Sequence, residues 1–391
     1  MHQNMAFHPS HPLWQVGFRP FFSFACLAGM LLPALWLMLY VGWIPAPMRN
    51  FSPMQWHAHE MFFGFGWAVI GGFLLTATKN WVQIRGFHGG SLMFLAAAWI
   101  FERLGMWFEA SLPPLLFRVS NNLFLVSIVA MLVWTLLRHR KTDSYRDNYF
   151  FLIVLPTFLV AKNLMLTGEY FAVGASMALG LFRVAFLVML ERTLTQFMKS
   201  AFQVEIMRNP RLDKLIKLLG VAMVFEQCLP AALSAGLALL LALLLAGRFV
   251  FWKPQLALRR LDIGIMYLGY LAIVAQLLMV CVQNLASPAW VGGVATHLFT
   301  FGVMGWIIPA MLVRISKGHT GRKVSFDASD KAVLWIMIMA FVARLVVPQI
   351  LPGGYVACLI FAAVCWFCCF ATLGWRYIPY LMQARADGKE H

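Results

Sequence analysis

Long apolar runs recur along the whole chain, and they restrict its fold more than any other feature of the 391 residues. A transmembrane helix needs about 20 mainly apolar residues, and inside a bilayer only helices and closed barrels satisfy their own backbone polar groups. The runs are too long and continuous for barrel strands. Composition supports this interpretation, because only 12% of the residues are charged, against about 25% in soluble domains. We therefore predict an all-α, polytopic membrane bundle.

Twelve candidate transmembrane helices fit the apolar runs. The loops between them are short and leave no room for a soluble domain. We therefore predict one helical domain over residues 1–391, with a cytoplasmic or interfacial segment at 1–20 and a cytoplasmic tail at 379–391. The predicted spans are residues 21–43, 56–78, 91–108, 114–137, 148–167, 171–198, 215–232, 234–252, 263–284, 291–315, 331–350 and 355–378.

The basic residues of the loops predict how the chain crosses the membrane. Lys and Arg accumulate in short cytoplasmic loops. With twelve spans, nearly all loop cations fall on the side that holds both termini, and Arg49 is almost alone on the other side. Both termini are therefore expected in the cytoplasm. The formal net charge of +16 is then an orientation signal, and we expect no nucleic-acid partner.

Three histidines lie at a similar depth on the outer side of the predicted membrane. His57 and His59 begin the second span, and His297 lies near the start of the tenth, which runs in the same direction. Ionisable residues within a membrane are costly and usually functional. The positions predict a metal site, and interfacial histidines bonded to carbonyl groups are the alternative. His319 follows the tenth span at the opposite face.

Helical spacing limits how the first two histidines act. Residues two apart on a helix point about 200° apart, so His57 and His59 are not expected to bind one ion unless the first turn is frayed. Met61 stands four residues after His57, and imidazole with thioether suits copper. Packing is the alternative role for Met61.

Cations in the outer layer of the predicted bundle outnumber the carboxylates beside them. A bound dianion, such as a pair of haem propionates, would balance them, because Arg binds carboxylates through two parallel hydrogen bonds. Two alternatives would also satisfy these cations: a bound substrate anion, or extension of the side chains to lipid head groups. The polar residues concerned are Glu102, Arg103, Arg118, Lys162, Glu226 and Arg344.

Four strings make the chain resemble a known family. In them it resembles the NnrS proteins, haem- and copper-containing membrane proteins of the bacterial nitric oxide response. The fifth span departs from the family, because Asn163 is not followed by the usual histidine, and the end of the sixth span reads Glu191 to Gln196. The matching strings are Gly17 to Phe22, Trp56 to Met61 with Phe63-Gly64-Phe65, Gly72 to Ala77 with Asn80-Trp81, and His297, Gly302 and Gly305 running to Arg314–Arg322.

The resemblance implies an inner-membrane protein with haem b and copper that binds nitric oxide, with His57, His59 and His297 as the most direct ligands. If such a protein is an enzyme, the expected reaction is reduction of nitric oxide to nitrous oxide, with a quinol or a periplasmic cytochrome as the electron donor. Glu60 and Glu102 would then supply protons, and Arg103, Arg118 and Arg344 would hold the propionates.

The remaining strings have structural interpretations. His319 is either a further ligand or part of a turn capped by Gly318. Arg19 is expected to anchor the N-terminal segment to lipid head groups.

Two other classes of protein remain open. A non-enzymatic sensor or protective protein would use the same ligands without turnover. A transporter of twelve spans is the third hypothesis, but the sequence shows no clear internal repeat of the kind that transporters often carry.

Overall fold

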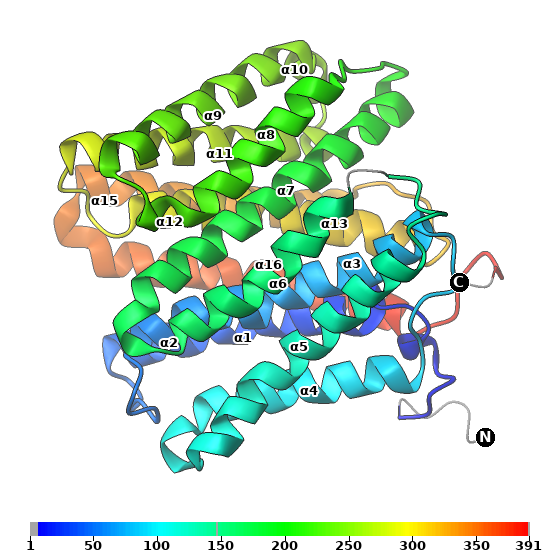
Figure 1. The fold of residues 1–391 in the computed structure, drawn as a ribbon, viewed down its shortest axis with the longest axis horizontal. Helices are drawn as coiled ribbons and strands as arrows, with labels where there is room; N and C mark the ends of the chain where they lie inside the picture. The colour runs from blue at the N-terminus through cyan, green and yellow to red at the C-terminus, as the bar shows by residue number, and fades with distance from the viewer. Residues whose placement is uncertain (1–6, 146–147, 390–391) are drawn as a thin grey trace. The chain divides into compact units, whose positions relative to one another are not determined.

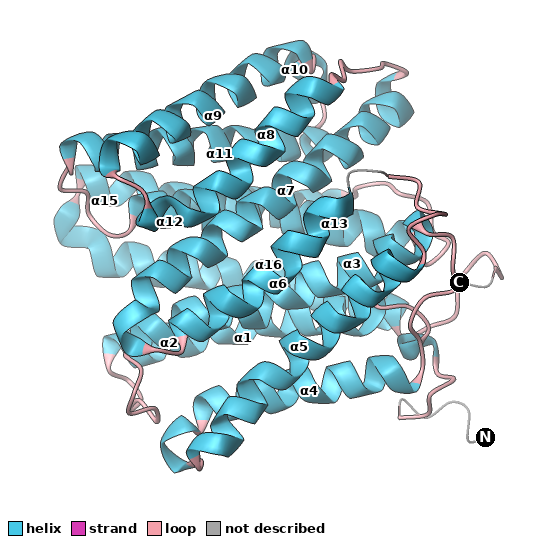
Figure 2. Ribbon diagram, in the orientation of Figure 1, coloured by secondary structure: helices cyan, strands magenta, loops and turns pink. Residues whose placement is uncertain are grey.

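The computed structural model describes residues 7–145 and 148–389, so the predicted N-terminal segment lies partly outside the described residues. The described chain is helical and contains no β-strand (Figures 1 and 2). The all-α prediction is therefore confirmed.

The α-helices follow the apolar runs in order along the chain. They are α1 (Phe18–Val41), α2 (Pro53–His59), α3 (Trp67–Trp81), α4 (Gly90–Trp107), α5 (Pro114–Arg138), α6 (Tyr149–Met165), α7 (Phe171–Phe202), α8 (Pro210–Ala222), α9 (Ala231–Phe251), α10 (Pro254–Ala257), α11 (Leu261–Ala286), α12 (Val294–His297), α13 (Gly305–Gly318), α14 (Ala328–Phe341), α15 (Val347–Ile350) and α16 (Tyr355–Leu381). Three π-helical segments, η3 (Glu60–Gly66), η8 (Leu298–Met304) and η9 (Val342–Val346), join α2 to α3, α12 to α13 and α14 to α15. Short 3-10 turns are η2 (Pro12–Trp14), η4 (Glu109–Ser111), η6 (Gly168–Tyr170), η7 (Met223–Cys228) and η10 (Pro352–Gly354).

Each predicted span overlaps a helix or a run of consecutive helices. The seventh, 215–232, crosses the break between η7 and α9 at residues 229–230. Among the described residues, nine of these runs are long and apolar enough to cross a membrane, so the chain is a multi-pass membrane protein. The other three are shorter or more polar: α6 has 17 residues, α8 turns into η7 after 13 residues, and α4 carries Glu102 and Arg103. The exact number of spans and the side of the termini stay predictions.

The surface of the helices fits a lipid environment. Many large apolar side chains point outward from the described helices, among them Trp134 at 63%, Val250 at 68% and Trp375 at 86% exposure. Soluble monomers rarely expose so much apolar surface. These residues therefore mark faces that the bilayer can cover.

The chain divides into two compact units. Unit 1 contains Met1–Ala175, Leu312–Ser325 and Phe370–His391, and unit 2 contains Ser176–Met311 and Phe326–Cys369. In unit 1, α1 packs along η3 and α3, and α4 packs along α5. In unit 2, α11 packs along α9 and η8. The prediction of one domain over residues 1–391 stays a prediction.

Candidate metal centre

The short helix α2 positions the first two histidines in unit 1. Ser52 and Gln55 form a capping box at its start, with Pro53 in its first turn, and both features favour a helix at this point. The helix continues to His59, so the two imidazoles have different neighbours. The half-buried His57 ring stacks on Trp36 with centroids 4.3 Å apart, and the His59 ring lies 5.3 Å from Phe63.

His59 is held by a carboxylate on one side of its ring. Its Nδ1 atom lies 3.1 Å from Oε1 of Glu60, and each residue is 1% exposed. A proton on Nδ1 is donated to that carboxylate, which leaves the lone pair on Nε2. The Nε2 atom is buried and has no hydrogen-bond partner among the described residues. Histidines that bind metals commonly have this arrangement, with one ring nitrogen bonded to a carboxylate and the other facing the metal.

A buried cluster of charges surrounds this pair. Glu60 Oε2 lies 3.3 Å from an Arg103 nitrogen, Arg103 also pairs with Glu102, and Lys162 Nζ lies 2.5 Å from Glu102 Oε1. The two carboxylates and two cations have a formal charge of zero. The sequence-based argument that cations lack carboxylate partners is therefore wrong for Arg103 and Lys162, and these two residues need no added dianion.

Gly64 makes room for the charge cluster. A Cβ atom at this position would overlap an Arg103 guanidinium nitrogen. The Gly64 carbonyl also accepts a hydrogen bond of 3.1 Å from the Trp99 indole. The Lys162 ammonium lies 5.4 Å from the Phe63 ring centroid. These contacts give the Phe63-Gly64-Phe65 string a physical reason.

His297 lies in unit 2 and has different partners. Its Nδ1 atom lies 2.7 Å from the Gly293 carbonyl. The Arg344 guanidinium, on η9, lies 3.3 Å from Nε2 of His297 and 3.3 Å from the Tyr355 hydroxyl. Both ring nitrogens are thus engaged, so a metal ion at Nε2 would have to displace the guanidinium.

The two histidine segments form a local repeat, which we call the histidine element. In each, Phe-Gly follows the histidine after three residues, as His59 to Gly64 and His297 to Gly302. Each histidine is followed directly by a seven-residue π-helical segment. Each ring also contacts the phenylalanine four residues later, with a centroid distance of 5.3 Å for Phe63 and 6.1 Å for Phe301.

This repeat was missed in the sequence because its signal is short. The expectation of no clear internal repeat, which concerned the two halves of a transporter, stays a prediction. Single-turn π segments are rare in proteins, and those that occur are often found at functional sites. In the described residues the third π segment holds Arg344. All three therefore lie at residues that the sequence singled out.

The other predicted site residues lie apart from the charge cluster. Arg118 is exposed on α5 and forms no ion pair with the described residues. His319 follows α13 in unit 1, with its ring 5.3 Å from Phe18. The turn has its positive φ angle at Gly321 (77°), so the prediction of Gly318 as the left-handed cap is wrong. The roles of Arg118 and His319 in cofactor binding stay predictions.

Arg19 is fully buried, and the prediction that it anchors to lipid head groups is wrong. It donates hydrogen bonds of 2.8 Å to the Leu381 carbonyl and 2.5 Å to the Gln383 carbonyl. The Arg322 guanidinium lies 3.9 Å from the Tyr380 ring and 3.0 Å from the Gln383 side chain. The first and last of the four strings therefore meet at the C-terminal end of α16.

The donor set suits a single haem ligand better than a protein-built metal cage. No group of three or more His, Cys, Asp or Glu side chains in the described chain could hold a metal ion. The described residues therefore hold no such three-residue cage for copper, and no chemical step is assigned to copper. A haem needs only one or two axial ligands from the protein, and the buried Nε2 of His59 fits that requirement.

A protein-family model described as NnrS protein matches residues 12–385, which is nearly the whole chain. No curated protein matches the chain.

Proposed function

The chain belongs to the NnrS family, and from this premise we propose that it is a haem b protein of the bacterial inner membrane that acts on nitric oxide, with His59 as a ligand of the haem iron. The family is associated with haem, copper and the nitric oxide response. The observation that carries the assignment to His59 is its buried Nε2 atom without a hydrogen-bond partner.

The residues around His59 have separable roles in this proposal. A bound haem supplies an iron centre with a free coordination position for a diatomic gas. Glu60 fixes the orientation and tautomer of the imidazole through Nδ1. Arg103 and Lys162 balance the carboxylates of Glu60 and Glu102, and buried ions need such partners. Phe63 packs beside the ring and limits the access of water.

If the protein is an enzyme, the reaction that we propose is reduction of two nitric oxide molecules to nitrous oxide and water. This reaction consumes two protons and two electrons, which a quinol or a periplasmic cytochrome would donate. Binding of nitric oxide without turnover is the second candidate function. It is favoured by the observation that Glu60 and Glu102, the predicted proton carriers, are already paired with Arg103 and Lys162.

The test compares His59→Ala with His57→Ala in purified protein. We expect the Soret band and the haem content to fall strongly in His59→Ala and to persist in His57→Ala, because His57 stacks on Trp36. Retention of full haem content by His59→Ala would exclude the assignment. Anaerobic measurement of nitrous oxide with a reduced quinol then separates the two candidates, since only the catalytic form produces it.

A further inference from the structure

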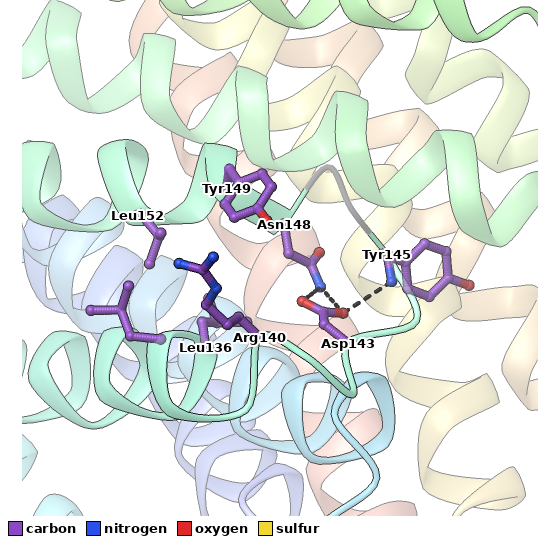
Figure 3. A pocket seen from close by; sticks show the side chains of 8 residues that line it. Leu136, Arg140, Asp143, Tyr145, Asn148, Tyr149 and Leu152 are labelled. Carbon is purple, nitrogen blue, oxygen red and sulfur yellow. Dashed lines mark hydrogen bonds between the residues drawn. The ribbon is translucent and has the colours of Figure 1, made fainter.

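A cavity of about 280 Å³ lies between the end of α5 and the start of α6 in unit 1 (Figure 3). It is remote in sequence from both histidine elements. Its lining combines leucines with tyrosines and a few polar side chains. The lining residues are Leu136, Leu137, Arg140, Asp143, Tyr145, Asn148, Tyr149 and Leu152.

Arg140 brings a positive charge to this cavity. Figure 3 shows its side chain extending from the turn after α5 into the space between the two helices. The carboxylate of Asp143, which also lines the cavity, accepts hydrogen bonds of 2.8 Å from the Asn148 amide and 3.0 Å from the Tyr145 backbone N–H. Arg140 forms no ion pair with the residues that the structure describes.

The apolar part of the cavity continues onto the outer face of the helices. Leu137 lines the cavity and is 49% exposed. Trp134, one turn earlier on α5, is 63% exposed, and Ile153, next to Leu152 on α6, is 61% exposed. An acyl chain could therefore run from the cavity along this face without leaving apolar surface.

The charge of the segment complements an anionic head group. Residues 138–149 contain four basic and two acidic side chains, which gives this segment a net charge of +2. One residue of each sign, Arg146 and Asp147, lies outside the described residues. The loop is on the predicted cytoplasmic side, where anionic lipids attract basic segments and bind in basic pockets between transmembrane helices.

We propose that this cavity binds one anionic phospholipid. Arg140 contacts the phosphate, Tyr149 in the same lining contacts the head group, and Leu137 and Leu152 contact the first methylenes of the chains. Guanidinium groups suit phosphate oxygens because they donate parallel hydrogen bonds. The site is independent of haem binding.

The experiment is native mass spectrometry of the purified full chain in neutral detergent, titrated with dioleoyl phosphatidylglycerol or dioleoyl phosphatidylcholine. We expect one phosphatidylglycerol to bind with at least a tenfold preference, and Arg140→Gln to weaken its binding about tenfold. Arg138→Gln is the matched control, because Arg138 is a nearby exposed arginine that does not line the cavity. It should bind phosphatidylglycerol like the wild type.

A second variant and a soluble probe separate the lipid from simpler ligands. Leu152→Trp keeps every charge but fills the cavity, so it should also weaken phosphatidylglycerol binding. Glycerol 1-phosphate has the head-group phosphate without acyl chains and should bind weakly. Equal binding of both lipids, unchanged binding by Arg140→Gln, or equally tight binding of glycerol 1-phosphate would each overturn the proposal.

Discussion

The Nδ1 atom of His59 lies 3.1 Å from the Oε1 atom of Glu60, the next residue in the chain. A helix normally directs successive side chains about 100° apart, yet here the two meet. The contact lies where α2 gives way to the π-helical segment η3. Glu60 is therefore a positioning residue for His59 in the proposed haem site.

Glu60→Gln should weaken haem binding without abolishing it. The amide keeps a hydrogen-bonding oxygen for Nδ1 but loses the negative charge, and loss of such partners typically costs about 10- to 100-fold in affinity for the bound metal group. Titration of the haem-free protein with haem, followed by its Soret band, measures this affinity. Glu109→Gln is a suitable control, since Glu109 is also buried but bonds Asn50 and the backbone of Arg49. An unchanged affinity in Glu60→Gln would show that the contact is incidental.

Gly64→Ala should destabilise the protein by about 1–3 kcal/mol, the usual cost of forcing extra atoms into a packed core. The added methyl would overlap an Arg103 guanidinium nitrogen, which ion pairs with Glu60 and Glu102 hold in place. Gly236→Ala is the matched control, because no atom lies within 4 Å of a Cβ placed there in α9. The control should be neutral or slightly stabilising, since alanine favours helices. Thermal unfolding in detergent measures both, and equal melting temperatures would contradict the steric argument.

Lys162→Met should cost about 3–5 kcal/mol, because it removes one partner of a fully buried ion pair. Glu102 would then keep only the Arg103 contact. The double variant Glu102→Gln/Lys162→Met should lose much less stability than the two single variants summed, since it removes the stranded charge. Lys199→Met is the control, because the Lys199–Glu205 pair is exposed and should have little effect. Additive losses in the double-mutant cycle would argue against a coupled pair.

Arg19→Gln should release the C-terminal end of α16. Hydrogen bonds from a charged group contribute about 1.5–3 kcal/mol each, and Arg19 donates to both Leu381 and Gln383. We expect a loss of about 2 kcal/mol or more, with faster tryptic cleavage after Arg385. Arg259→Gln, at an exposed position, should leave the cleavage rate unchanged. If both variants were cut at the wild-type rate, Arg19 would not hold this segment.

The sequence predicts the helices well because the bilayer sets their length. Each predicted span has a helical counterpart, including the junction near Pro230, where η7 ends at Cys228 and α9 begins at Ala231. The spacing of His57 and His59 correctly predicts different neighbours for the two rings. These inferences depend on local periodicity, which can be read from a single sequence.

The partners of buried charges could not be predicted in the same way. Lys162 meets Glu102 across 60 residues, and Arg19 meets Leu381 across 362. Such contacts depend on how helices pack, and no local pattern encodes them. The π-helical segments are also missed, because one extra residue in a turn leaves the apolar pattern almost unchanged. The histidine element is too short for a sequence pattern to predict, because it consists of one His and a Phe-Gly pair three residues later.

The two copies of the histidine element differ in the charge that meets the imidazole. In one copy a carboxylate draws on the ring proton of His59, which enriches the ring in electron density. In the other, a guanidinium faces His297 and withdraws density from it. The two imidazoles thus meet opposite charges, so an iron bound to His59 would have a lower reduction potential than one bound to His297.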